Sequence, residues 1–183
     1  QGGSDVRTNT TVATPVNGGG AGAEYEVTGH KFFCSAPMSD LFLILAQTGD
    51  GLSCFALPRI LPDGTPNRYR IVRLKEKLGT RGMPSGETRL EGATAYLVGD
   101  PGRGFVQMAE MVNQSRLSNG VRSTGMMRRA VHEALTVALG RQAFGKRLID
   151  LPLVRRQLIK MILPAEAALS VAFFTAQCLE RAD

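Results

Sequence analysis

The stretch GDPGRGF, residues 99–105, separates two parts of the chain that differ in texture. Over residues 25–97, short apolar runs alternate with turn signals, a pattern typical of strands and hairpins. GDG at 49–51 predicts a hairpin turn between two apolar runs, and PDGTPN at 62–67 predicts a longer loop. From Phe105 onward, proline and glycine thin out and apolar residues recur at helical spacing. The sequence therefore predicts a β unit followed by a helical unit.

We accordingly predict an α+β fold, with an antiparallel β-barrel-like domain over residues 1–103 and antiparallel helices of an incomplete bundle over residues 104–183. The last helix is expected to begin with Asp150 as N-cap and Pro152 in its first turn. Pro164 lies inside that helix and predicts a kink or a break. Two or three amphipathic helices cannot cover their own apolar faces, so we expect a piece of a larger protein.

Composition narrows the classes of function. The 183 residues are 43% hydrophobic, which suffices for one fair-sized core or two small ones. No run approaches the roughly 20 apolar residues of a membrane span, and no secretory leader pattern is visible, so we expect a cytoplasmic protein without a membrane span. The three cysteines lack C-x-x-C spacing and the two histidines are far apart, which argues against a disulfide framework and a metal site.

The net charge of +6 is unevenly distributed. Residues 106–183 carry 11 Lys and Arg against 6 Asp and Glu, whereas residues 1–105 carry 11 against 10. Such a basic excess suits a partner with phosphates, whether a cofactor pyrophosphate, a coenzyme or nucleic acid. For any single arginine, a solvated helix face is the simpler interpretation.

Five motifs in order along the chain resemble the acyl-CoA dehydrogenase family. They are GGSD at 2–5, TGHKFFCSAP at 28–37, KLGTRGMPSGE at 77–87, GDPGRGF at 99–105 and RQAFGKRL at 141–148. FCSAP, together with EMVNQSRL at 110–117, is most similar to the branch of the family associated with the adaptive response to alkylation damage. The resemblance implies the middle β domain and the start of the C-terminal helical domain, with an N-terminal helical domain and the C-terminal end outside the chain.

The resemblance also implies FAD as cofactor and assigns the residues around its ring. Ser4 would offer its hydroxyl to the flavin or to the acyl-CoA thioester. Phe33 would pack on the isoalloxazine, and Ser35 would hydrogen-bond near flavin N5, where a hydroxyl tunes the cofactor. Cys34 adjoins both as a further cofactor-side residue, although an inert buried thiol is the simpler interpretation.

By the same resemblance, the helical half would hold the FAD phosphates. Arg141 would reach the pyrophosphate of a neighbouring subunit through its guanidinium fork, which implies a homo-oligomer, either a dimer or a tetramer. Phe144 would pack near the adenine, and Gly145 is expected to end the preceding helix.

For the substrate, Asn113 and Arg116 fall where relatives hold the acyl-CoA, and Thr48 matches a hydroxyl on the substrate side. The family's reaction removes an α-proton with a carboxylate while the β-hydride passes to flavin N5. Ser115 stands where some relatives carry a glutamate, and Glu110 is expected to have a surface or capping role. The sequence therefore names no catalytic base.

Three functions remain open. The first is an FAD-dependent acyl-CoA dehydrogenase of fatty acid metabolism, with electron-transfer flavoprotein as a candidate partner; the chain by itself is expected to be inactive and not to retain FAD. The second is an alkylation-response flavoprotein with weak dehydrogenase activity that binds DNA without sequence preference. The third is a flavin-free interaction module. The DNA-binding surface would comprise Arg122, Arg128, Arg129, Arg155 and Arg156.

Overall fold

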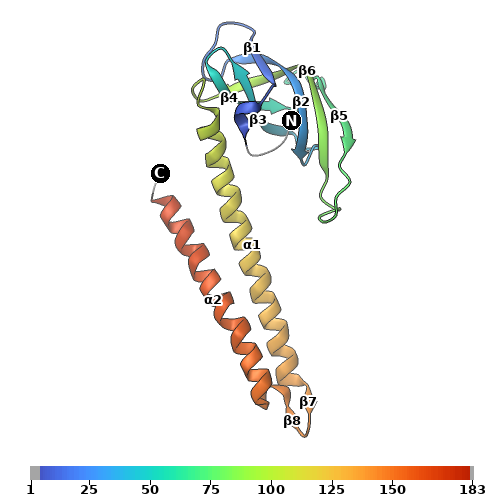
Figure 1. Cartoon of the computed structure of the whole chain (residues 1–183), viewed down its shortest axis with the longest axis vertical. Helices are drawn as coiled ribbons and strands as arrows, with labels where there is room; N and C mark the ends of the chain where they lie inside the picture. Colours follow the sequence, from blue (N-terminus) through green and yellow to red (C-terminus); the bar gives the residue numbers. More distant parts are fainter. Residues whose placement is uncertain (1–4, 182–183) are drawn as a thin grey trace. The chain divides into compact units, whose positions relative to one another are not determined.

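A computed structural model describes residues 5–181 of the chain (Figure 1). It divides into two units, Gln1–Met111 and Val112–Asp183, which are described separately below. The elements of the first unit are η1 (Val6–Thr8), β1 (Val12–Pro15), β2 (Glu24–Ser35), β3 (Leu41–Thr48), β4 (Gly51–Pro58), β5 (Tyr69–Leu74), β6 (Ser85–Val98) and the start of α1 (Gly104–Gly140). The second unit holds the rest of α1, β7 (Gln142–Ala143), β8 (Lys146–Arg147), η2 (Leu148–Asp150) and α2 (Pro152–Glu180).

The six long strands form one sheet in the order β2-β1-β3-β4-β6-β5, and an additional pairing of β2 with β6 closes it into a barrel-like arrangement (Figure 1). All neighbouring pairs are antiparallel except β1 and β3, which run parallel. The predicted class, a β-barrel-like domain followed by helices, is confirmed, with the parallel pair as a departure from the purely antiparallel sheet expected.

The core of the first unit follows from the period-2 alternation of its strands. Inward-facing apolar side chains of β2, β4 and β6 meet inside the sheet, and the rings of Tyr25 and Phe55 pack edge to face with centroids 5.0 Å apart. Val27, Phe55 and Leu57 are fully buried. The predicted GDG hairpin turn is also confirmed, because Thr48 pairs with Gly51 across a two-residue connection between β3 and β4.

Helix α1 begins where the GDPGRGF stretch meets β4. The backbone N–H of Gly102 donates to Ser53 Oγ at 2.9 Å. A Cβ added to Gly104 would lie 2.4 Å from the carbonyl carbon of Ser53, closer than real side chains approach. Glycine at 104 therefore lets the first turn of α1 contact the strand backbone directly.

In the second unit, α1 and α2 run side by side in opposite directions and are joined by the β7–β8 hairpin (Figure 1). The expected helix end at Gly145 is wrong, because α1 ends at Gly140. Phe144 and Gly145 instead form the hairpin turn, with φ angles of 54° and 71°. Both central residues of a type I′ turn need positive φ, which accounts for a glycine at this position.

Two expectations about α2 also need correction. Its N-cap is Leu151, which makes no side-chain cap bond, rather than Asp150. Asp150 ends η2, and its carboxylate pairs with Arg147 at 3.1 Å and Arg155 at 3.6 Å. Of the kink or break predicted at Pro164, the break does not occur, because α2 continues from Pro152 to Glu180.

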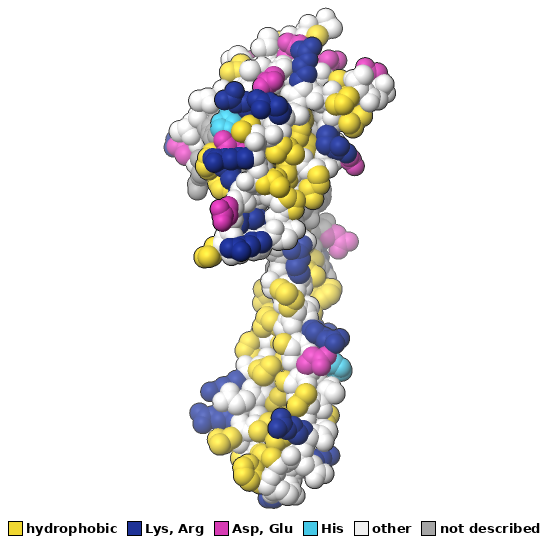
Figure 2. All heavy atoms as spheres, turned by 90° about the vertical axis from the view of Figure 1, so that its right-hand side faces the viewer, with side chains coloured by type: hydrophobic (Ala, Val, Ile, Leu, Met, Phe, Trp, Pro, Cys, Tyr) yellow, Lys and Arg dark blue, Asp and Glu magenta, His cyan; other side chains and the backbone are white. Residues whose placement is uncertain are grey.

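Many large apolar side chains of α1 and α2 are exposed, and Figure 2 shows apolar side chains on the face of the helical part that it presents. Helix α2 contains an 18-residue window with a mean hydropathy of 1.6, of which 17% is buried. By length and composition α2 could cross a membrane, a property that the expectation drawn from uninterrupted apolar runs did not anticipate. The same composition also occurs in bundle helices that bury several faces against neighbours.

Candidate functional site

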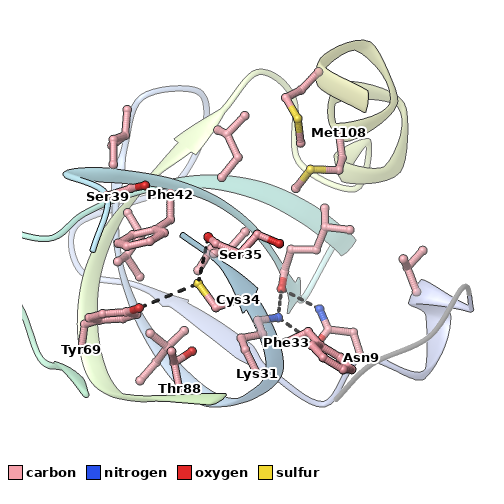
Figure 3. Close-up of a pocket in the computed structure, with 18 of the residues that line it drawn as sticks. Asn9, Lys31, Phe33, Cys34, Ser35, Ser39, Phe42, Tyr69, Thr88 and Met108 are labelled. Atoms are coloured by element: carbon pink, nitrogen blue, oxygen red, sulfur yellow. Dashed lines mark hydrogen bonds between the residues drawn. The ribbon is translucent and has the colours of Figure 1, made fainter. Parts of the chain in front are cut away.

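A cavity of about 510 Å³ opens in the first unit beside the end of β2 (Figure 3). Strand β2 contributes Lys31, Phe33, Cys34 and Ser35 to its wall. Strand β3 contributes a run of apolar side chains over residues 41–45, and two methionines from the first turns of α1 complete the apolar lining. The structure thus brings three of the sequence-predicted cofactor residues together in one cavity.

A β-bulge determines how these β2 residues point. The register between β2 and β6 shifts between Lys31 and Cys34. A bulge interrupts the alternation of a strand and re-aims its side chains. As a result, Phe32 and Phe33 are both exposed although they are consecutive, at 39% and 59%. The bulge thereby leaves the ring of Phe33 accessible at the cavity.

The end of β2 is fixed by a tight turn beside Ser35. Ser35 pairs with Ser85 of β6, and Ala36 then adopts a left-handed conformation with φ of 49°. A Cβ on Gly86 would lie 3.0 Å from the Pro37 ring, so glycine allows the turn to pack against β6. The backbone at Ser35 is therefore fixed by the pairing with Ser85 and by the turn that begins at Ala36.

Lys31 is a cavity residue that the sequence analysis did not single out. Its Nζ donates to the Leu45 carbonyl oxygen at 2.6 Å and to Asn9 Oδ1 at 3.2 Å (Figure 3). Burial lowers the pKa of Lys31 to about 8. A signal was available, because Lys31 lies at the same inward-facing parity of β2 as Tyr25 and Val27.

Cys34 contacts Tyr69 behind the exposed edge of the cavity. The Tyr69 hydroxyl donates to the Pro37 carbonyl at 3.1 Å and lies 3.8 Å from Cys34 Sγ. Burial raises the pKa of Cys34 and also that of Tyr69. Because a raised pKa disfavours the thiolate, the environment of Cys34 agrees with an inert thiol rather than a nucleophile.

The donor set of this cavity fits the flavin ring that the family resemblance implies. An exposed aromatic face is supplied by Phe33, an apolar wall by β3, and polar hydrogens by the Ser35 hydroxyl and the Lys31 amine. A flat heteroaromatic ring with a polar edge needs this combination of apolar surface and a few placed donors. Among the described residues, no group of three or more His, Cys, Asp or Glu could hold a metal ion.

A second cavity, of about 650 Å³, lies between α1 and α2 in the second unit. Asn113 and Arg116 both line it, and Arg116 Nη1 donates to Asn113 Oδ1 at 3.3 Å. The remaining wall consists mostly of small and apolar side chains from the two helices. The structure therefore brings the two predicted acyl-CoA residues together at the mouth of an apolar groove.

The other predicted residues lie elsewhere. The Thr48 hydroxyl donates to the Gly51 carbonyl at 2.9 Å inside the β3–β4 turn and lines neither cavity. Arg141 is exposed just after α1, and Phe144 is 93% exposed at the tip of the β7–β8 hairpin. Ser4 lies outside the described residues.

No carboxylate in the described part of the chain is placed as a base. The second cavity has no acidic residue in its wall. Asp5 lines the first cavity, but Arg7 Nε lies 2.8 Å from its carboxylate and lowers its pKa through that hydrogen bond. Glu110 is exposed on α1. Within residues 5–181, neither of the two cavities therefore offers an unpaired carboxylate.

Comparisons with known proteins show which family the chain is similar to. The model of the acyl-CoA dehydrogenase middle domain matches residues 1–93, and that of the acyl-CoA dehydrogenase C-terminal domain matches residues 102–183. The chain is 42% identical over 181 residues to the putative acyl-CoA dehydrogenase AidB of Escherichia coli strain K12, covering 99% of this chain and 33% of that protein.

Two solved structures are similar as well. The apo form of Bd2924 superposes with a TM-score of 0.82 at 35% identity, covering 97% of this chain and 37% of that one. Caenorhabditis elegans ACDH-11, solved in complex with C11-CoA, gives 0.83 at 35% identity, covering 97% of this chain and 31% of that one. The chain thus spans about one third of the length of these three relatives.

Proposed function

The chain belongs to the acyl-CoA dehydrogenase family, and its similarity to AidB agrees with the alkylation-response branch. From this premise we propose that the full-length protein is an FAD-dependent dehydrogenase that converts an acyl-CoA thioester to the 2,3-enoyl-CoA. The observation that carries the proposal is the cavity at the end of β2, where Phe33 and Ser35 meet an apolar wall in the middle domain.

In this proposal, each cavity residue has a limited role. When bound, FAD supplies the acceptor for the β-hydride. Phe33 offers an aromatic face against which the ring can pack. The Ser35 hydroxyl donates a hydrogen bond to the polar edge of the ring, and the apolar side chains of β3 exclude water from it.

The substrate is proposed to contact the second cavity. Arg116 and Asn113 supply polar groups for the coenzyme part of the ligand, and the apolar helix surfaces supply room for an acyl chain. C11-CoA is bound in the similar structure of ACDH-11, which favours an acyl-CoA ligand here. We place the base that removes the α-proton in the full-length protein outside residues 5–181.

The test is an anaerobic titration of the full-length protein, isolated with its own cofactor, with acyl-CoAs of short, medium, long and branched chains. Loss of the long-wavelength flavin absorbance with one class is the expected result and would also identify the substrate. A bound flavin that none of these thioesters reduces would contradict the dehydrogenase activity. Reduction by dithionite in the same cuvette is the control that the flavin is accessible to electrons.

A second candidate, non-specific DNA binding, is favoured by one observation. Arg122, Arg128 and Arg156 are exposed on α1 and α2, and within residues 5–181 none of the three is in an ion pair, whereas Arg129 and Arg155 are paired with acidic residues. Free guanidinium groups on helices suit duplex phosphates. The test is fluorescence anisotropy with labelled duplexes of unrelated sequence at increasing salt. Affinity that falls steeply with salt and ignores sequence is expected; absence of binding at low salt would contradict it.

A further inference from the structure

A group of four charged side chains, here the Glu87 cluster, lies beside the Phe32–Phe33 bulge. It consists of His30, Arg73, Lys75 and Glu87. The Glu87 carboxylate lies 2.6 Å from Arg73 Nε, 3.0 Å from Lys75 Nζ and 2.8 Å from His30 Nε2. The hydrogen bonds from Arg73 and Lys75 lower the pKa of Glu87 to about 2, so this carboxylate is ionised at neutral pH.

Lys75 connects this cluster to the aromatic pair. Its Nζ lies 3.2 Å from the centroid of the Phe32 ring and 5.1 Å from that of Phe33. The two rings pack edge to face with centroids 5.1 Å apart. An ammonium over an aromatic face is attracted by the ring quadrupole, and more strongly when it is shielded from water. Lys75 is shielded, with only 10% of its side chain exposed.

The cluster is not neutral. Two basic side chains, Arg73 and Lys75, face one carboxylate, so the cluster has an excess of basic groups before His30 is counted. The Lys75 ammonium lies nearest to the aromatic rings. Positive charge beside a cofactor favours the form that carries more negative charge, which for a flavin is the reduced one.

We infer that the Glu87 cluster is a positioning and electrostatic element of the flavin site, in which Lys75 holds the Phe32–Phe33 pair and its charge raises the reduction potential of the bound flavin. This inference rests on the proposed function, because it assumes that the Phe33 ring lies against the flavin. Lys75 positions the two rings through its contacts with Phe32 and Phe33, and its charge acts on the flavin through space.

The signs of the expected effects separate this role from a purely structural one. Lys75→Met removes a cation and should lower the potential, whereas Glu87→Gln removes the anion and should raise it. Lys75→Arg keeps the positive charge beside the rings, so its reduction potential should stay closer to the wild-type value than that of Lys75→Met, although a guanidinium does not reproduce the contacts of the ammonium. A structural disturbance alone would shift the reduction potentials of Lys75→Met and Glu87→Gln in the same direction.

The experiment measures the reduction potential of FAD in the full-length protein by equilibration with a redox dye during slow enzymatic reduction. A unit charge on a side chain near the flavin changes the equilibrium between oxidised and reduced flavin on the order of tenfold. For Lys75→Met we therefore expect the ratio of reduced to oxidised flavin at fixed potential to fall about tenfold, which is about 30 mV for a two-electron couple. Arg70→Gln is the matched control, since Arg70 is an exposed cation on β5 that pairs with Glu91.

The outcomes distinguish the inference from the function on which it rests. Unchanged potentials in Lys75→Met and Glu87→Gln, with FAD bound, would overturn the inference and leave the dehydrogenase proposal intact. Shifts of the same sign in both variants would also overturn it. If either variant fails to fold or to hold FAD, Arg73→Gln must lower the potential instead. A wild-type protein that holds no flavin would overturn the proposed function and this inference together.

Discussion

At the scale of the residue, Ser35 is the side chain on which the flavin proposal can be tested most directly. Its hydroxyl projects into the first cavity from the last position of β2, between the Ser85 pairing and the left-handed Ala36. A neutral hydrogen bond contributes roughly 0.5–1.5 kcal/mol net, which corresponds to a change in rate of about twofold to slightly more than tenfold.

We therefore predict that Ser35→Ala slows flavin reduction by the best acyl-CoA up to about tenfold in the full-length protein, without loss of FAD. Anaerobic stopped-flow absorbance measures this rate. Ser39→Ala is the matched control, because Ser39 lines the same cavity from beyond the turn and should leave the rate unchanged. Equal rates in wild type and Ser35→Ala would show that this hydroxyl does not contact the reacting ring.

Lys31 gives a second test at this scale. Its pKa of about 8 lies below the ordinary lysine value of about 10.4, so between these pH values the unfolded state binds more protons than the folded state. Stability should consequently rise with pH across that window. A ¹³Cε NMR titration of the lysines, with Lys31→Met to assign the signal, should give one midpoint near 8. A midpoint near 10.4 for this lysine would contradict its burial.

Whether the sequence alone could identify these residues depends on how far apart in the chain their contacts lie. Phe33, Cys34 and Ser35 share one short motif, so a local resemblance sufficed to group them, and the structure places them in one cavity. Lys31 acquires its environment from Asn9 and Leu45, which lie 22 and 14 residues away. No local pattern predicts such a contact, although a charged residue at an inward-facing strand position, as at Lys31, indicates that a polar partner must lie nearby.

At the scale of the element, the bulge in β2 and the start of α1 position the first cavity. The alternation of apolar residues predicts strands, but a bulge adds one residue without changing composition, so it was not predictable. The same limit applies to β7 and β8. Gly145 is an ordinary signal for a helix end, but here it lies in the turn of the β7–β8 hairpin. Asp150 is an ordinary signal for an N-cap, but here its carboxylate forms an ion pair.

The glycine at the start of α1 leads to a prediction about this element. Gly104→Ala should destabilise the protein by roughly 2 kcal/mol, because the new Cβ would lie 2.4 Å from backbone atoms of β4 that cannot move freely. Gly125→Ala, in the same helix with nothing within 4 Å, should stabilise it by up to about 1 kcal/mol. Thermal unfolding followed by circular dichroism compares the two. Destabilisation of equal size by both would show that the contact at residue 104 does not matter.

At the scale of the whole molecule, the order of a β domain followed by helices was predictable, because a period of two gives way to helical spacing at GDPGRGF. The surface that packs against the helices was not predictable, since the chain spans only about one third of the length of AidB. Large exposed apolar side chains on α2 include Leu153, Leu163, Val171, Phe173 and Phe174. Apolar surface of this extent normally contacts another part of a protein.

We therefore predict that Phe174, 65% exposed on α2, is buried in the full-length protein. Phe174→Asp should lower its unfolding free energy by at least about 3 kcal/mol, because truncating a buried aromatic ring costs about 3–5 kcal/mol and an unpaired carboxylate adds to that. Lys160→Gln, an exposed polar position on the same helix, should change it by less than about 0.5 kcal/mol. Urea unfolding of the wild type and the two variants measures these changes in unfolding free energy. If Phe174→Asp is as mild as Lys160→Gln, this face of α2 stays open to solvent and a bundle packed around it is excluded.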